Sequence, residues 1–140
     1  NTLRDIWGTG SDNVYALAWN GVHHYDGTSW TDQTAFFAGT VRGIWGSAAD
    51  DIFVLGSGGS IQHFDGAQWT EMESGVDAEL YDAWGTGPDN VYAVGKSGTI
   101  IHYDGTSWSI KLVVDEINFY AVWGSGPDDI YAVGGWNLGG

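Results

Sequence analysis

Three histidines recur in one sequence context and raise the question of a metal site. Each stands two residues before an aspartate that opens a turn. The pairs are His24 and Asp26, His63 and Asp65, and His102 and Asp104. Zinc needs ligands about 2.0 to 2.3 Å from one ion, which equivalent positions in successive repeats cannot provide. We therefore expect each histidine to hydrogen-bond a turn Asp, Ser or Thr of its own repeat, and only His23 lacks a counterpart.

Four acidic or amide pairs could supply oxygen ligands for calcium. They are Asp12-Asn13, Asp50-Asp51, Asp89-Asn90 and Asp128-Asp129. Each pair offers too few ligands within one turn, so we expect these residues to stabilise turns and strand entry instead. The sequence predicts neither a metal site nor a cofactor.

Two arginines occupy equivalent places in the first two repeats. Arg4 and Arg42 stand where Tyr81 and Tyr120 stand in the later repeats. They could line the mouth of a channel, where a guanidinium group would bind an anionic ligand. In so acidic a chain we favour pairing with local carboxylates.

The elements that position these groups follow from a tandem repeat. A Trp-Gly motif begins at Trp7, Trp45, Trp84 and Trp123, at spacings of 38, 39 and 39 residues. A second motif, His-aromatic-Asp-Gly-x-x-Trp, ends at Trp30, Trp69 and Trp108. A repeat of about 40 residues rich in Gly, Trp and β-formers has the length of one four-stranded propeller blade, whereas helical repeats need Ala- and Leu-rich stripes. We assign both motifs a structural role.

Each repeat contains four short β-forming runs separated by Gly, Asp and Asn clusters, which predicts strands a to d. The chain is therefore expected to be all-β, a single partial β-propeller of four-stranded antiparallel blades. Complete blades are predicted at 3–34, 40–73 and 79–113, and a half-blade with strands a and b at 118–135. Closed propellers have about four to eight blades, and an open arc exposes apolar faces. Further blades or copies of the chain would close the ring, and we favour a fragment of a larger propeller, with seven blades as one full count.

The segment from Val91 to Trp108 resembles a tectonin-type propeller repeat. Its end, Asp-Gly-Thr-Ser-Trp, resembles the Asp-box of sialidase-like propellers, although Trp108 follows Asp104 by four residues, one fewer than in the usual box. The recurring histidine is similar to the buried polar network of WD-repeat blades. This resemblance covers essentially the whole chain and implies a β-propeller, with a bacterial repeat protein as the expected source.

The resemblance to sialidases does not extend to catalytic residues. Sialidase chemistry needs an arginine cluster, and the sequence has only two arginines. A glycosidase needs two carboxylates about 5 to 10 Å apart, and the eighteen acidic residues single out no such pair. No Ser-His-Asp order, Cys-His pair or phosphate-binding Gly loop is present. We therefore expect no enzymatic activity.

Comparison between repeats separates two kinds of loop. The a-b and c-d turns are nearly identical in every repeat, whereas the b-c turns and d-a loops change in content and lie together on the opposite face of a propeller. Ligands are usually bound by such variable loops. The candidate ligand-binding residues on this face are Trp19, Asn20, Phe36, Phe37, Glu71, Glu73, Asp77, Trp136 and Asn137.

Aromatic rings beside amide and carboxylate groups suit a sugar, whose C–H face stacks on the ring while its hydroxyls form hydrogen bonds. For Phe36 and Phe37 the alternative is packing under the loop against the next blade.

Charge and composition exclude several partners. The formal net charge is -14, which disfavours nucleic acid and an anionic membrane surface. No apolar run approaches the roughly 20 residues of a spanning helix, so no membrane insertion is expected. The absence of cysteine leaves the compartment open, and we expect a secreted or cell-surface protein.

The function predicted from the sequence is a non-enzymatic propeller module that binds a glycan or a protein through its variable loops. Two alternatives remain. One is a structural or assembly propeller within a larger protein, and the other is the propeller part of a glycoside hydrolase.

Overall fold

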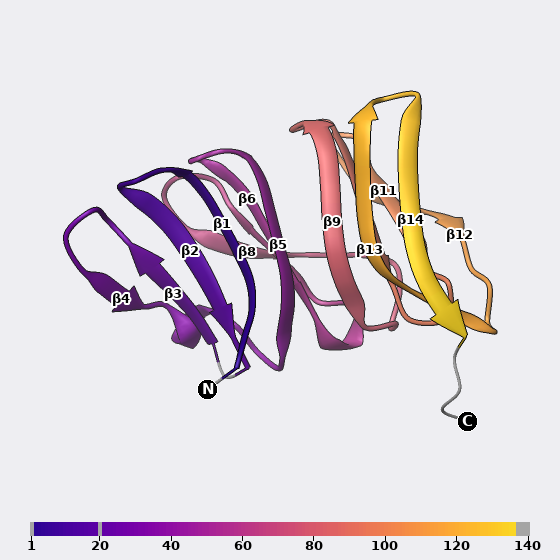
Figure 1. Ribbon diagram of the computed structural model, residues 1–140, viewed down its shortest axis with the longest axis horizontal. Helices are drawn as coiled ribbons and strands as arrows, with labels where there is room; N and C mark the ends of the chain where they lie inside the picture. Colours follow the sequence, from indigo (N-terminus) through magenta and orange to yellow (C-terminus); the bar gives the residue numbers. More distant parts are fainter. Residues whose placement is uncertain (1, 20, 137–140) are drawn as a thin grey trace.

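The computed structural model describes residues 2–19 and 21–136, which form an arc of four antiparallel β-sheets (Figure 1). The first sheet contains β1 (Leu3–Gly10), β2 (Asn13–Ala18), β3 (Gly21–Tyr25) and β4 (Trp30–Asp32). The second contains β5 (Val41–Ala48), β6 (Asp51–Gly56), β7 (Ile61–Phe64) and β8 (Trp69–Met72). The third contains β9 (Leu80–Gly87), β10 (Asn90–Gly95), β11 (Ile100–Tyr103) and β12 (Trp108–Leu112).

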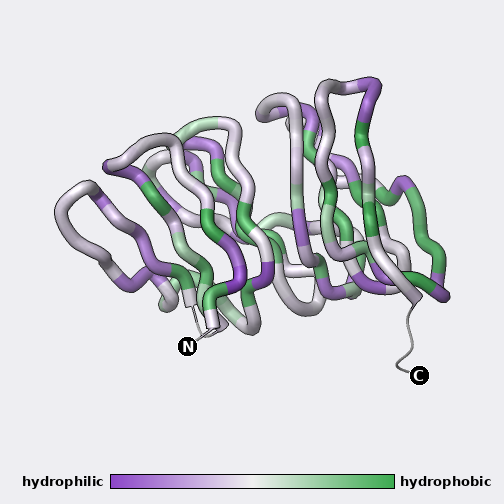
Figure 2. The backbone as a smooth tube through the Cα atoms, in the orientation of Figure 1, coloured by the Kyte–Doolittle hydropathy of each residue, from purple (hydrophilic) through white to green (hydrophobic). Residues whose placement is uncertain are grey.

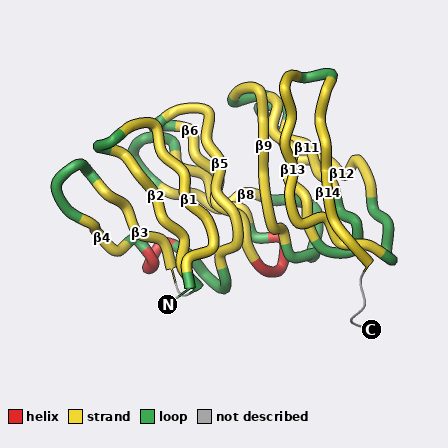
Figure 3. Tube along the Cα trace, viewed as in Figure 1, coloured by secondary structure: helices red, strands yellow, loops and turns green. Residues whose placement is uncertain are grey.

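The fourth sheet has two strands, β13 (Ile117–Gly126) and β14 (Asp129–Trp136). Two short 3-10 helices, η1 (Thr34–Phe36) and η2 (Ser57–Gly59), lie in loops at the lower edge of the arc (Figure 3). Strand order in every sheet follows the sequence, as in propeller blades. The prediction of three propeller blades and half of a fourth is confirmed.

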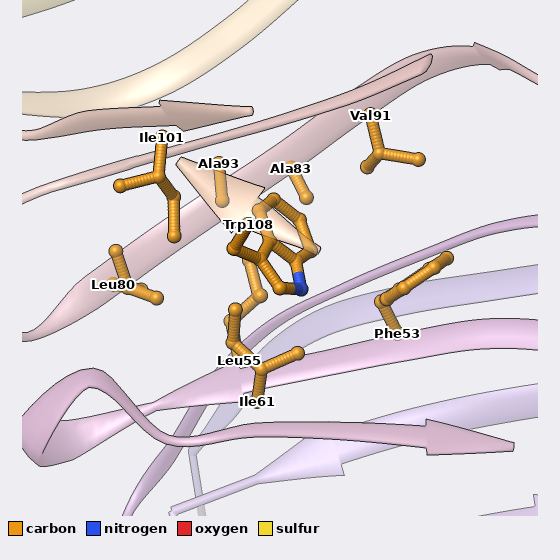
Figure 4. Packing of buried hydrophobic residues seen from close by; sticks show 9 residues of the cluster. All are labelled: Phe53, Leu55, Ile61, Leu80, Ala83, Val91, Ala93, Ile101 and Trp108. Carbon is orange, nitrogen blue, oxygen red and sulfur yellow. The ribbon is translucent and has the colours of Figure 1, made fainter. Parts of the chain in front are cut away.

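The second strand of each complete blade forms the core because both of its faces are covered. In β10, Val91, Ala93 and Val94 are fully buried. In Figure 4, Trp108 of the third blade lies close to Leu55 and Ile61 of the second, and together they belong to one buried cluster. The most hydrophobic stretches accordingly lie within the strands, while the β1–β2 and β13–β14 turns are hydrophilic (Figure 2). The blades are therefore held together by apolar burial between sheets.

The Trp-Gly motif packs one blade on the next. A Cβ atom added at Gly85 would lie 2.9 Å from the Trp45 ring, and one added at Gly124 would lie 2.6 Å from the Trp84 ring. The first glycine of the motif thus leaves the space that the preceding blade's tryptophan occupies. Because the inner strands β5, β9 and β13 approach in this way, any side chain at these glycines would push the blades apart.

The turn between the third and fourth strands of each blade is closed by its aspartate. Asp26 Oδ1 accepts hydrogen bonds from the backbone N–H groups of Thr28 at 2.8 Å and Ser29 at 2.9 Å. These bonds lower the pKa of Asp26, and the same arrangement lowers the pKa values of Asp65 and Asp104. Gly27 has φ of 92°, a conformation that glycine adopts without strain. The repeated Asp-Gly motif therefore stabilises a turn.

Candidate recognition surface

The variable loops meet at one edge of the arc, opposite the repeated turns. The repeated turns adjoin each other, because a Cβ at Gly27 would lie 2.8 Å from Asp12 of the β1–β2 turn. At the other edge, the Thr40 N–H of a d-a loop donates a hydrogen bond to Ser57 Oγ of a b-c turn, at 3.2 Å. The first strand of each blade starts at this variable edge.

A groove of about 680 Å³ opens at this edge along the inner strands. We call it the inner groove, and its lining residues are Thr2, Leu3, Arg4, Trp19, Arg42, Tyr81 and Tyr120. Each blade contributes one residue from the same position near the start of its first strand: Arg4 on β1, Arg42 on β5, Tyr81 on β9 and Tyr120 on β13. Two cations and two phenols therefore form a row across four neighbouring strands.

Arg42 in this row is paired with a carboxylate. Its Nε lies in hydrogen-bond contact with Glu79 Oε1, and Tyr81 Oη donates a hydrogen bond to Glu79 Oε2 at 3.3 Å. Burial, with the nearby Glu79 charge, raises the pKa of Tyr81. The expected pairing of an arginine with a local carboxylate is present for Arg42. Sequence reasoning did not find Glu79, because it is 37 residues from Arg42 and does not share its repeat position.

Arg4 has a different environment. Its guanidinium carbon lies 4.5 Å from the centre of the Trp19 ring, which is a cation–π distance. Its buried Nε has no hydrogen-bond partner among the residues that the structure describes. No carboxylate within these residues forms an ion pair with Arg4. The guanidinium group of Arg4 therefore lies against the ring of Trp19 and lines the inner groove.

Tyr81 and Tyr120 continue the row. Their rings lie 5.4 Å apart at an angle of 35°. Asn118 Nδ2 donates a hydrogen bond to Tyr120 Oη at 3.2 Å, and Asn118 Oδ1 accepts the Ser97 N–H at 3.0 Å. The floor of the inner groove is thus ordered by side-chain contacts across the blades.

A second groove, of about 480 Å³, lies among the loops of the second blade. Its lining includes Glu71, Glu73 and Asp77 together with the η2 residues Ser57 and Gly59. The three acidic residues predicted as ligand-binding are therefore brought together here. They line this second groove, whereas Trp19 lines the inner groove.

The predicted aromatic residues do not form one site. Trp19 is 59% exposed in the inner groove, and Phe36 is 59% exposed on η1. Trp136 is exposed at the end of β14, opposite Ile117, and does not line the inner groove. The ring of Phe37 packs edge-on against Trp69 at 4.9 Å and adjoins a core cluster, which is the alternative of packing under the loop. Asn20 and Asn137 lie outside the described residues.

The recurring histidines are hydrogen-bonded within their blades. The partner is the residue that opens the second strand: Asn13 for His24, Asp51 for His63 and Asn90 for His102, each at 2.7 Å. The expected partner was an Asp, Ser or Thr of the turn, so the amides in the first and third blades correct that detail. An amide serves because its oxygen accepts the bond from the ring N–H.

The described part of the chain shows no group of three or more His, Asp or Glu side chains that could hold a metal ion. Nor does it contain a helix of the length and apolar character that a membrane span requires.

No family model and no curated protein sequence matches this chain. Solved structures do resemble it. YCF48 from Cyanidioschyzon merolae superposes with a TM-score of 0.78 at 15% identity, over 96% of this chain and 48% of that one. A structure described as YCF48 bound to D1 peptide superposes with a TM-score of 0.78 at 16% identity, over the same shares. The likeness shows the β-propeller fold, and this chain spans about half the length of these YCF48 chains.

Proposed function

We propose that this chain is a non-enzymatic protein-recognition module that binds a segment of a partner protein in the inner groove. The observation that carries the proposal is the row of Arg4, Arg42, Tyr81 and Tyr120 beside the exposed ring of Trp19. Exposed Trp, Tyr and Arg side chains are the residue types that dominate protein-binding hot spots. The YCF48 neighbour with a bound D1 peptide supports the same class of partner.

The electrostatic setting favours a segment with a carboxylate. The chain has a net charge of -14 and only four Lys and Arg residues, of which two lie in this groove. Arg42 is already paired with Glu79, whereas Arg4 contacts only the neutral ring of Trp19 among the groups described for it. A carboxylate of the partner would gain a charge-assisted hydrogen bond from Arg4.

A glycan is the second candidate ligand, since an exposed tryptophan can stack on a sugar. Arg4 lies over the Trp19 ring at 4.5 Å and competes for that stacking surface. Protein is therefore the favoured ligand class.

The proposal is tested by screening the folded chain against an array of random twelve-residue peptides and against a glycan array. We expect selected peptides whose retention is lost with Arg4→Ala and kept with Lys96→Ala, a matched loss of one exposed charge outside the groove. Arg4→Lys should bind weakly, because an ammonium group lacks the planar stacking of a guanidinium. Glycan retention without any peptide retention would reject the proposal and favour a lectin.

A further inference from the structure

The outer edge of β14 lacks a second partner among the described residues. β14 pairs with β13, whereas β2, β6 and β10 each also pair with the third strand of their own blade. Tyr131 and Val133 of β14 are each 59% exposed, while the equivalent Tyr15 and Leu17 of the first blade are 3% and 0% exposed. An apolar edge strand of this kind readily accepts another strand.

The complete blades show which residue such a strand places at each position. Within each complete blade the histidine of the third strand stands directly opposite an aromatic residue of the second. The pairs are Tyr15 and His24, Phe53 and His63, and Tyr92 and His102, with ring centres 4.3, 4.6 and 4.6 Å apart. By the same register, a histidine would stand opposite Tyr131.

The carboxylate that would hold this histidine is already oriented. In the second blade Asp51 uses Oδ2 to accept a bond from Ser47 Oγ and Oδ1 to bind His63 Nε2 at 2.7 Å. In the half-blade Ser125 Oγ donates to Asp129 Oδ2 at 2.5 Å. By equivalence with Asp51, Asp129 Oδ1 is the atom that would bind a histidine, and none of the histidine bonds in the described residues reaches it. The Tyr131 side chain also forms a hydrogen bond with this carboxylate. Half of the hydrogen-bond network is therefore built.

A second contact point lies on the third blade. The tryptophan that begins the fourth strand packs on the aromatic residue of the preceding blade: Trp69 on Tyr15 at 6.1 Å and Trp108 on Phe53 at 5.9 Å. The next aromatic residue in this series is Tyr92. No tryptophan among the described residues packs on Tyr92.

From these two contact points we infer that the edge of β14 binds a β-hairpin of this repeat type, which takes the places of the third and fourth strands of the half-blade. Its first strand runs antiparallel to β14 and places a histidine opposite Tyr131, with Nε2–H donated to Asp129 Oδ1. An aromatic-Asp-Gly turn follows, and a tryptophan at the start of the second strand packs on Tyr92. This is strand addition with a specific side-chain register. The inference is independent of the inner groove, which is lined by residues of the first strands together with Thr2 and Trp19.

The test uses the chain with a synthetic peptide copied from residues 98–113, which contains one such hairpin. Binding is followed by hydrogen exchange of individual amides in the chain. We expect added protection of the β14 amides from Ile130 to Val133. Peptides carrying His102→Ala or Trp108→Ala should each bind at least tenfold more weakly.

A pair of chain variants separates this register from nonspecific strand pairing. Asp129→Ala should weaken peptide binding, while Asp129→Asn should retain it, because Asn13 and Asn90 hold histidines in the other blades. Protection elsewhere than β14, equal affinity of all three peptides, or equal binding by Asp129→Ala would overturn the inference. Association of two copies that protects β14 and excludes the peptide would also overturn it.

Discussion

Asp82 joins two blades through one carboxylate. Its Oδ2 accepts a hydrogen bond from the backbone N–H of Val122 on the next blade at 2.9 Å, while Oδ1 accepts that of Ala83 at 2.9 Å. Asp5 makes the equivalent bond to Ile44 of the second blade at 3.0 Å. Asp82 is half-buried, and this burial raises the pKa of its carboxyl group.

Replacement of Asp82 tests the strength of this link. Asp82→Ala removes two accepted hydrogen bonds and leaves N–H donors in a partly buried place, so we expect the free energy of unfolding to fall by about 1 to 3 kcal/mol. Urea denaturation followed by tryptophan fluorescence measures the change. Asp115→Ala, at an exposed position before β13, is the control and should change stability little. Equal effects of the two variants would contradict a role for the carboxylate between blades.

Glycine replacements within one motif test the packing of tryptophan on the next blade. Gly124→Ala would place Cβ 2.6 Å from the Trp84 ring and 2.7 Å from the Asp129 carbonyl oxygen, whereas Gly126→Ala meets nothing within 4 Å. We expect Gly124→Ala to lower the thermal midpoint through a loss of about 1 to 3 kcal/mol, and Gly126→Ala to leave it nearly unchanged. The prediction fails if both alanines behave alike in calorimetric scans.

The aspartates of the repeated turns should make the free energy of unfolding depend on pH. Backbone N–H bonds from Ser107 and Thr106 lower the pKa of Asp104 in the folded state below its ordinary value of 3.8. A lowered folded pKa adds stability above the unfolded pKa, and this stability is lost as the pH falls through the folded pKa. Asp104→Asn removes the titrating charge and keeps an acceptor oxygen.

We therefore expect the wild-type chain to exceed Asp104→Asn in stability at pH 7, and the two to converge below about pH 4. Unfolding curves at several pH values measure this difference, and comparing the two chains cancels the opposite contribution of Asp82. A difference that stays constant between pH 7 and pH 3 would refute the prediction.

The neighbouring phenylalanines of the first d-a loop should differ in their effect on stability. Phe37 packs on Trp69, so Phe37→Ala should cost about 1 to 3 kcal/mol, less than the loss of a fully buried ring. Phe36 is 59% exposed, and Phe36→Ala should stay within about 0.5 kcal/mol of the wild type. Denaturation midpoints of the two variants decide the matter, and a reversed order would show that the loop packs differently.

The repeat made the fold predictable from sequence. Tryptophan and Asp-Gly motifs recur at nearly constant spacing. The tryptophan packs on a glycine of the next blade, and the aspartate closes a turn. Local hydrogen bonds and turn conformations depend on residues close in sequence, so pattern alone identifies them.

The candidate recognition surface was less predictable because it is assembled from different blades. Variation between repeats pointed to Trp19, but not to Glu79 as the partner of Arg42, since that contact joins unequal positions of two repeats. Phe37 could not be separated from Phe36 by residue type, because only the position of Trp69 decides which ring is covered.

The measurement that tests the recognition proposal most directly is the dissociation constant of an array-selected peptide, determined by titration calorimetry with Trp19→Ala and Phe36→Ala chains. Both replacements remove an exposed aromatic ring at the variable edge, and only Trp19 lines the inner groove. Binding in that groove predicts at least tenfold weaker affinity for Trp19→Ala, about 1.4 kcal/mol, and unchanged affinity for Phe36→Ala. Unchanged affinity with Trp19→Ala, in a chain that keeps its wild-type unfolding curve, would contradict it.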